Sequence, residues 1–76
     1  MRDRRELAIL ALALVEGSVH GDPLADDLAI DAFSSTEEAA TAHAYLAGFL
    51  IEFLASQRDE TIDATLTEVR RLLGAA

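Results

Sequence analysis

The stretch from Ala39 to Ala55, AATAHAYLAGFLIEFLA, constrains the fold of this chain more than any other feature. Only Thr41, His43 and Glu52 interrupt it with clearly polar side chains, and its alanines and leucines favour a helix. Such a helix must bury most of its circumference. A chain of 76 residues has little protein to cover it, because domains of this size bury only about 60% of their unfolded surface. We therefore expect a small helical protein that a second chain completes.

The composition supports a single all-helical domain over residues 1–76. Hydrophobic residues make up 51% of the chain, the mean hydropathy is +0.22, and there is one proline. The chain has no cysteine, so packing must hold the fold, and disulfides and thiolate metal ligands are excluded. An absence of cysteine is typical of cytoplasmic proteins, and we expect this protein to be one.

The hydrophobic pattern predicts four helices joined by short polar turns. They span residues 3–16, 23–32, from Ser34 or Ser35 to about Ser56, and from about Asp59 to Leu73. Short connections favour antiparallel neighbours. The expected fold is therefore an all-α bundle of three to four helices, in which the long apolar third helix is central.

Local signals mark the ends of these helices. Gly17 and Gly74 are placed to end the first and last helices, and Asp22 followed by Pro23 is a typical helix start. Ser34 with Glu37, or Ser35 with Glu38, forms a capping box for the third helix.

A helical projection divides the third helix into three sides. Its polar residues form one narrow stripe: Glu37, Glu38, Thr41, Tyr45, Gly48, Glu52 and Ser56. A bulky apolar side consists of Ala42, Leu46, Phe49, Leu50 and Phe53, and a side with mainly small residues consists of Ala40, Ala44, Ala47 and Ile51. The bulky side contributes to the predicted core, which is Leu7, Leu10, Leu14, Leu46, Phe49, Phe53, Leu66 and Val69.

The remaining apolar positions predict a homodimer. Small side chains let another helix approach closely, and Ile9 and Leu12 point away from the core face of the first helix. The predicted partner-binding residues are Ile9, Leu12, Ala40, His43, Ala44, Ala47 and Ile51.

His43 projects into the apolar arc, where it could bind a metal or sense pH. No second ligand stands one turn away, because Ala39 and Ala47 occupy those positions. A buried neutral imidazole, hydrogen-bonded to a carbonyl or to its symmetry mate, is the favoured interpretation, and no metal or cofactor is expected.

Charge limits the classes of partner. The net charge is −8 and all arginines lie near the two ends, so we expect no direct binding to nucleic acid. An acidic cluster consists of Asp22, Asp26, Asp27, Asp31, Glu37 and Glu38. It is either a docking surface for a basic protein or a solvated face with helix caps.

A membrane span is the less favoured interpretation of residues 39–55. Seventeen residues is the lower limit for spanning, Glu52 lies inside the stretch, and the polar stripe is continuous. We also expect no secretory signal, because Asp3 and Glu6 dilute the basic start.

Catalysis finds no support, because the chain lacks a phosphate-binding glycine loop, a nucleophile motif and paired histidines. The leading hypothesis is a noncatalytic protein–protein interaction module, namely a small acidic regulator, adaptor or accessory protein. One alternative is an acidic inhibitor or nucleic-acid mimic that occupies a basic site. The other is a small-ligand or enzyme role at a dimer pocket.

Overall fold

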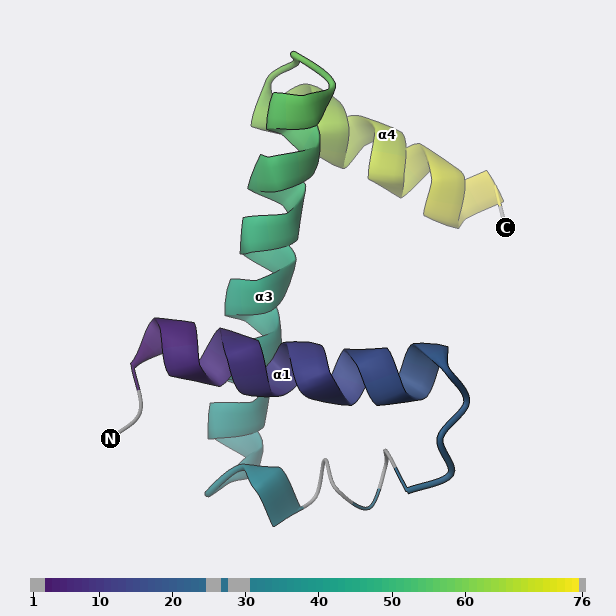
Figure 1. The fold of residues 1–76 in the computed structure, drawn as a ribbon. Coiled ribbons are helices and arrows are strands. Elements are labelled where there is room, and N and C mark those ends of the chain that lie inside the picture. Colours follow the sequence, from purple (N-terminus) through teal and green to yellow (C-terminus); the bar gives the residue numbers. More distant parts are fainter. Residues whose placement is uncertain (1–2, 25–26, 28–30, 76) are drawn as a thin grey trace. The chain divides into compact units, whose positions relative to one another are not determined.

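The computed structural model describes residues 3–24, 27 and 31–75, and every regular element in them is helical. The elements are α1 (Arg4–Val19), α3 (Thr36–Gln57) and α4 (Ile62–Ala75), as Figure 1 shows. The prediction of an all-α chain is confirmed. The helix predicted at residues 23–32 includes residues 25, 26 and 28–30, which lie outside the described residues.

Helix α1 starts as its sequence suggests but ends later than predicted. The Asp3 carboxylate accepts a hydrogen bond from the Glu6 N–H at 2.8 Å and caps the helix. The prediction that Gly17 ends α1 is wrong, because the helix continues to Val19. The terminating glycine is Gly21, whose φ of 74° is the left-handed conformation that glycine adopts without a Cβ clash.

The end of α1 is a Schellman motif. The Asp22 N–H donates to the Gly17 carbonyl at 2.9 Å, and the Gly21 N–H donates to the Ser18 carbonyl at 3.0 Å. These two bonds satisfy carbonyls that the end of a helix would otherwise leave without donors.

Helix α3 uses one of the two predicted capping boxes. The Ser35 hydroxyl accepts from the Glu38 N–H at 3.0 Å, and the Glu38 carboxylate accepts from the Ser34 N–H at 3.0 Å. The carboxylate thus bonds one residue further back than in the usual box. The helix then runs to Gln57, one residue beyond the expected end.

A second Schellman motif joins α3 to α4. The Glu60 N–H donates to the Ala55 carbonyl at 3.0 Å, and Asp59 has a φ of 52° at the position that Gly21 fills after α1. Helix α4 then begins at Ile62, where the Thr61 hydroxyl accepts from the Ala64 N–H at 3.1 Å. The expectation that Gly74 closes this helix is wrong, because α4 continues to Ala75.

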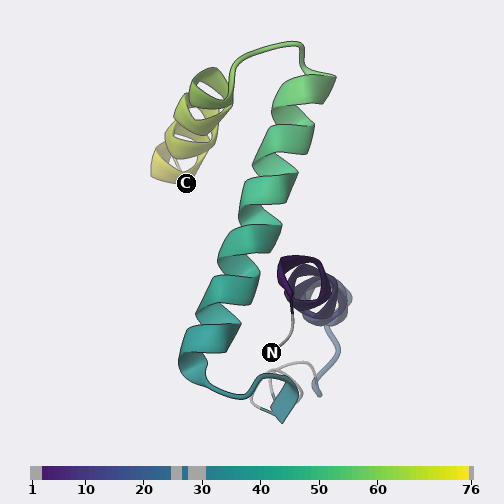
Figure 2. The ribbon, with the colours of Figure 1, turned by 90° about the vertical axis from the view of Figure 1, so that its left-hand side faces the viewer.

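The chain forms two compact units, residues 1–46 and 47–76, and α3 contributes to both. In the first unit α1 crosses the first part of α3, as the two views in Figures 1 and 2 agree. The core of this unit consists of Leu7, Ala11, Leu14, Phe33, Ala42 and Leu46. Three predicted core residues, Leu7, Leu14 and Leu46, are therefore confirmed, and Leu10 is half-buried beside them.

The second unit contains very little core. Among its described residues, Ala55 and Thr65 are the buried ones, and Val69 is half-buried. The prediction that Phe49, Phe53 and Leu66 are core is wrong for the single chain, because their exposed fractions are 62%, 55% and 37%. Phe49 and Phe53 are exposed because α4 packs on a different side of α3. The side of α3 that faces α4 carries the buried Ala55, and the two phenylalanines lie roughly opposite it on the helix.

Candidate interaction surface

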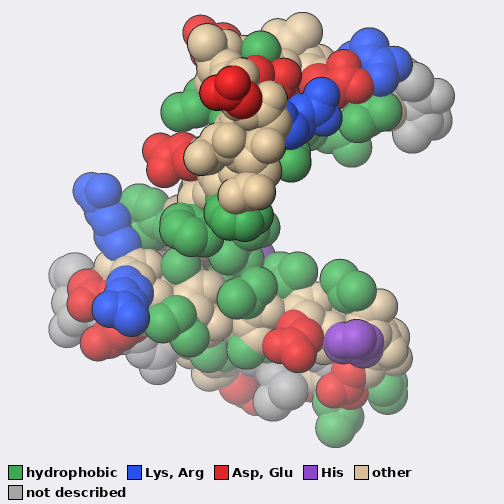
Figure 3. All heavy atoms as spheres, turned by 45° about the horizontal axis from the view of Figure 1, so that its top comes forward, with side chains coloured by type: hydrophobic (Ala, Val, Ile, Leu, Met, Phe, Trp, Pro, Cys, Tyr) green, Lys and Arg blue, Asp and Glu red, His purple; other side chains and the backbone are tan. Residues whose placement is uncertain are grey.

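Large apolar side chains are exposed on every described helix. Figure 3 shows several of them at the surface, interspersed with charged groups. They are Ile9, Leu12, Val19, Leu24, Phe49, Leu50, Phe53, Leu54, Ile62, Leu66, Leu72 and Leu73. Single exposed apolar residues are normal, but a protein of this size rarely leaves so many uncovered without a partner.

The second unit has the densest group of them. Phe49, Leu50, Phe53 and Leu54 are consecutive members of the apolar face of α3, and each has an exposed fraction of at least 39%. With Ala55 and Thr65 as the buried residues, this helix pair has few apolar contacts to offset the entropy of folding. Most of the large apolar side chains of the α3–α4 pair are therefore exposed in the single chain.

The residues predicted to bind a partner are almost all accessible. Ile9 and Leu12 have exposed fractions of 58% and 48%. Ala40, His43, Ala44 and Ala47 are also exposed, and Ile51 is half-buried. The geometry therefore leaves these positions available, although no contact in the single chain shows what would cover them.

His43 differs from its predicted state in one respect. Its Nδ1 lies 2.8 Å from the Ala39 carbonyl oxygen, one helical turn earlier. Because a carbonyl only accepts, Nδ1 carries the proton in this bond. The expected carbonyl partner is thus present, but the imidazole is exposed and not buried, with its ring edge against Phe33 at a centroid distance of 5.9 Å. The sequence placed the ring on an apolar arc that the chain itself does not cover.

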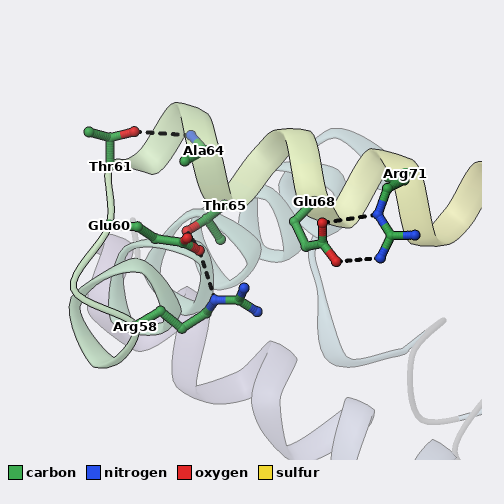
Figure 4. Close-up of polar contacts among 7 residues, drawn as sticks. All are labelled: Arg58, Glu60, Thr61, Ala64, Thr65, Glu68 and Arg71. Atoms are coloured by element: carbon green, nitrogen blue, oxygen red, sulfur yellow. Dashed lines mark hydrogen bonds and ion pairs between the residues drawn. The ribbon is translucent and has the colours of Figure 1, made fainter.

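Polar contacts to the Glu60 carboxylate link the turn before α4 to the first turns of that helix (Figure 4). The Thr65 hydroxyl donates to the Glu60 carboxylate at 2.9 Å, and Arg58 forms an ion pair with the same carboxylate at 2.8 Å. Thr65 is only 1% exposed, so this bond satisfies a hydroxyl that burial would otherwise penalise. Thr65 is not among the residues that the sequence analysis singled out. The acid five residues earlier was the available signal for its partner.

Further along α4, Arg71 forms a bidentate ion pair with Glu68. Its Nε and Nη2 donate to the two carboxylate oxygens at 3.0 and 2.5 Å. These hydrogen bonds lower the pKa of Glu68 below its ordinary value and raise the pKa of Arg71. The pair stands at the surface, where an ion pair contributes little to stability.

The predicted acidic surface is only partly available. Asp22, Asp27, Asp31 and Glu37 are exposed, Glu38 is half-buried, and Asp26 lies outside the described residues. Asp22 accepts from the Leu24 N–H at 2.9 Å, and Glu38 accepts from the Ser34 N–H at the start of α3. Glu38 therefore fits the helix-cap interpretation, and Asp22 forms a local bond to the backbone.

The described residues offer little that could bind a small ligand or a metal ion. Among the described residues no group of three or more His, Asp or Glu side chains is placed to hold a metal ion. One open hollow of about 340 Å³ is lined by Leu10, Ala13, Leu14, Asp31 and Ala32. Its lining carries a single charged group and no arrangement for chemistry.

Helix α3 is long and apolar enough to cross a membrane, with a mean hydropathy of 1.2 over its best window. Only 17% of that window is buried inside the chain. Core helices of soluble proteins pass the same test of length and composition, so these properties alone assign no membrane role.

Comparisons with protein families, with curated protein sequences and with solved structures find no match to this chain.

Proposed function

We propose that this protein is a noncatalytic protein–protein interaction module that works as a helical homodimer. The observation that carries the proposal is the second unit, where Phe49, Phe53 and their neighbours are exposed while Ala55 and Thr65 are the buried described residues. Obligate dimer interfaces resemble a domain core cut in half, which fits this pattern. The dimer would complete the helical bundle that one chain only begins.

In this proposal the protein is a small acidic regulator, adaptor or accessory protein of the cytoplasm. Its role is to present a folded surface to another protein and not to transform a substrate. The net charge of −8 keeps such a surface soluble and favours basic partners.

Sedimentation equilibrium at micromolar concentration tests the proposal directly. We expect a mass twice that of the 8.2 kDa chain. A single monomeric species at every concentration would remove the basis of the proposal. Charge reversal at Asp27 and Asp31 is the companion experiment, because it leaves dimerisation intact if apolar side chains form the interface.

A further inference from the structure

The open hollow beside α1 combines apolar side chains with one carboxylate. Leu10, Ala13 and Leu14 come from α1, and Asp31 and Ala32 come from the segment before α3. All of them belong to the first compact unit, residues 1–46. The volume of about 340 Å³ is enough to admit a branched or aromatic side chain of another molecule.

The burial of the lining residues shows what such a side chain would meet. Leu14 is 9% exposed and Leu10 and Ala32 are half-buried, whereas Ala13 and Asp31 are exposed. The base of the hollow is therefore apolar, and the acidic residue lies near its opening. An apolar group that enters would lose contact with water, while a charged neighbour could stay at the surface beside Asp31.

Charge favours a cation as that neighbour. No lysine or arginine occurs in the sequence between Arg5 and Arg58, and the acidic cluster lies inside this stretch. Among the described residues, the ion pairs of Arg58 and Arg71 use other carboxylates than that of Asp31. A guanidinium suits this position best, because it is weakly hydrated and pairs with a carboxylate through two hydrogen bonds.

We propose that the hollow docks a segment of a partner protein in which a large apolar side chain stands next to an arginine. The apolar side chain enters the hollow, and the guanidinium pairs with Asp31. A protein segment fits better than a free small molecule, because an open hollow covers too little of a small ligand, whereas a folded partner adds contacts around it. This inference rests on the proposed interaction-module function and specifies the chemistry of the partner.

Three blocked dipeptides serve as probes in low-salt buffer, where the charge effect is largest. They are acetyl-leucyl-arginine amide, acetyl-leucyl-glutamine amide without the charge, and acetyl-glycyl-arginine amide without the apolar side chain. Each is titrated to millimolar concentration into the full chain labelled with ¹⁵N. The backbone amide shifts of Leu10, Ala13 and Asp31 report binding at the hollow.

We expect saturable shifts with the leucyl-arginine probe. The leucyl-glutamine probe should bind about two- to fivefold more weakly, the effect of one exposed ion pair. The glycyl-arginine probe should bind about tenfold more weakly, because it buries no apolar side chain.

Three variants locate the two contacts. Asp31→Asn should remove the preference for arginine over glutamine, and Ala13→Leu should weaken both leucyl probes by filling the hollow. Asp27→Asn is the matched control, because Asp27 is an exposed acid of the same cluster that does not line the hollow, and it should keep the preference. Circular dichroism checks that each variant retains the helix content of the wild type.

Equal binding of the arginine and glutamine probes, or a preference that survives Asp31→Asn, would overturn the ion pair. An absence of saturable shifts, or an unchanged affinity in Ala13→Leu, would overturn the hollow as the docking site. In a protein that sediments as a dimer, these results leave the proposed function standing. A monomer in sedimentation removes the proposed function even where the titration succeeds.

Discussion

At the scale of single residues, Thr65 is the buried polar group whose partner can be tested most directly. Thr65→Val keeps the shape of the side chain but removes the donor to Glu60. We expect a loss of about 1 to 2 kcal/mol of unfolding free energy, because a hydrogen bond to a charged group is lost inside a buried site. Urea denaturation followed by circular dichroism measures it.

Thr67→Val is the matched control for this change. Thr67 lies on the same helix and donates to the Asp63 carbonyl at 2.9 Å, but it is exposed, so water replaces the lost bond. Its cost should stay within about 0.5 kcal/mol. Equal losses for both variants would contradict the importance assigned to the Glu60 contact.

The Glu68–Arg71 ion pair predicts that folding stability decreases as the pH falls. Because the folded pKa of Glu68 is lowered by the Arg71 hydrogen bonds, its contribution to stability is present above the unfolded pKa and is lost as pH falls through the folded pKa. Arg71→Gln should raise the pKa of Glu68 towards its ordinary value. A titration of the Glu68 side-chain carboxyl by NMR measures this shift, and an unchanged pKa would show that the pair does not form in solution.

At the scale of elements, the cap of α3 separates two overlapping sequence motifs. Ser35→Ala removes the acceptor of the Glu38 N–H and should destabilise the protein by about 1 kcal/mol. Ser34→Ala is the control, because in the described residues Ser34 contributes only its backbone N–H to this cap. Thermal unfolding of both variants should therefore shift for Ser35 alone, and a larger effect at Ser34 would mean that the other predicted box is used.

The glycines predict stability changes of opposite sign. Gly21→Ala should destabilise by about 1 kcal/mol, because an alanine at a φ of 74° is strained whatever space surrounds it. Gly48→Ala should stabilise by about 0.5 to 1 kcal/mol, because Gly48 lies inside α3 and a Cβ there meets nothing within 4 Å. Urea midpoints of the two variants give the signs, and a destabilising Gly48→Ala would indicate that another chain approaches this residue closely.

The sequence predicted the existence of α1, α3 and α4, whereas it did not predict all of their ends. The apolar period of residues 39–55 and the Ser35 box locate α3 to within a residue or two. Gly17 and Gly21 are equally good candidates for ending α1, and composition does not rank them. The two Schellman bonds that Gly21 makes possible decide between them. Asp59 carries no signal as strong as glycine, so the left-handed turn before α4 was missed.

At the scale of the whole molecule, periodicity identified apolar faces but not what covers each one. Leu7, Leu14 and Leu46 were correctly placed in the core, because α1, which carries Leu7 and Leu14, packs on the side of α3 that carries Leu46. Phe49 and Phe53 continue the same side of α3, but α4 packs elsewhere and leaves them exposed. The apolar periodicity of a helix face is the same whether the chain's own core or a partner covers that face, so one sequence cannot distinguish the two cases. The same ambiguity put His43 in a buried site.

Leu50→Glu uses this ambiguity as a test of assembly. In a monomer Leu50 is 44% exposed, and a surface substitution there would change unfolding free energy by about 0.5 kcal/mol or less. In the proposed dimer it would place a carboxylate in an apolar layer, so stability should fall by several times that amount.

The dependence on protein concentration makes the distinction sharper. Folding that is coupled to dimerisation follows mass action, so each tenfold increase in wild-type concentration should add about 1.4 kcal/mol per dimer to the apparent stability. Leu50→Glu should abolish this dependence as well as lower the urea midpoint, since it removes the association and not only a contact. Glu52→Gln, two residues away on the polar stripe, should keep both properties of the wild type. A wild-type midpoint that stays constant across concentrations would contradict the proposed dimer.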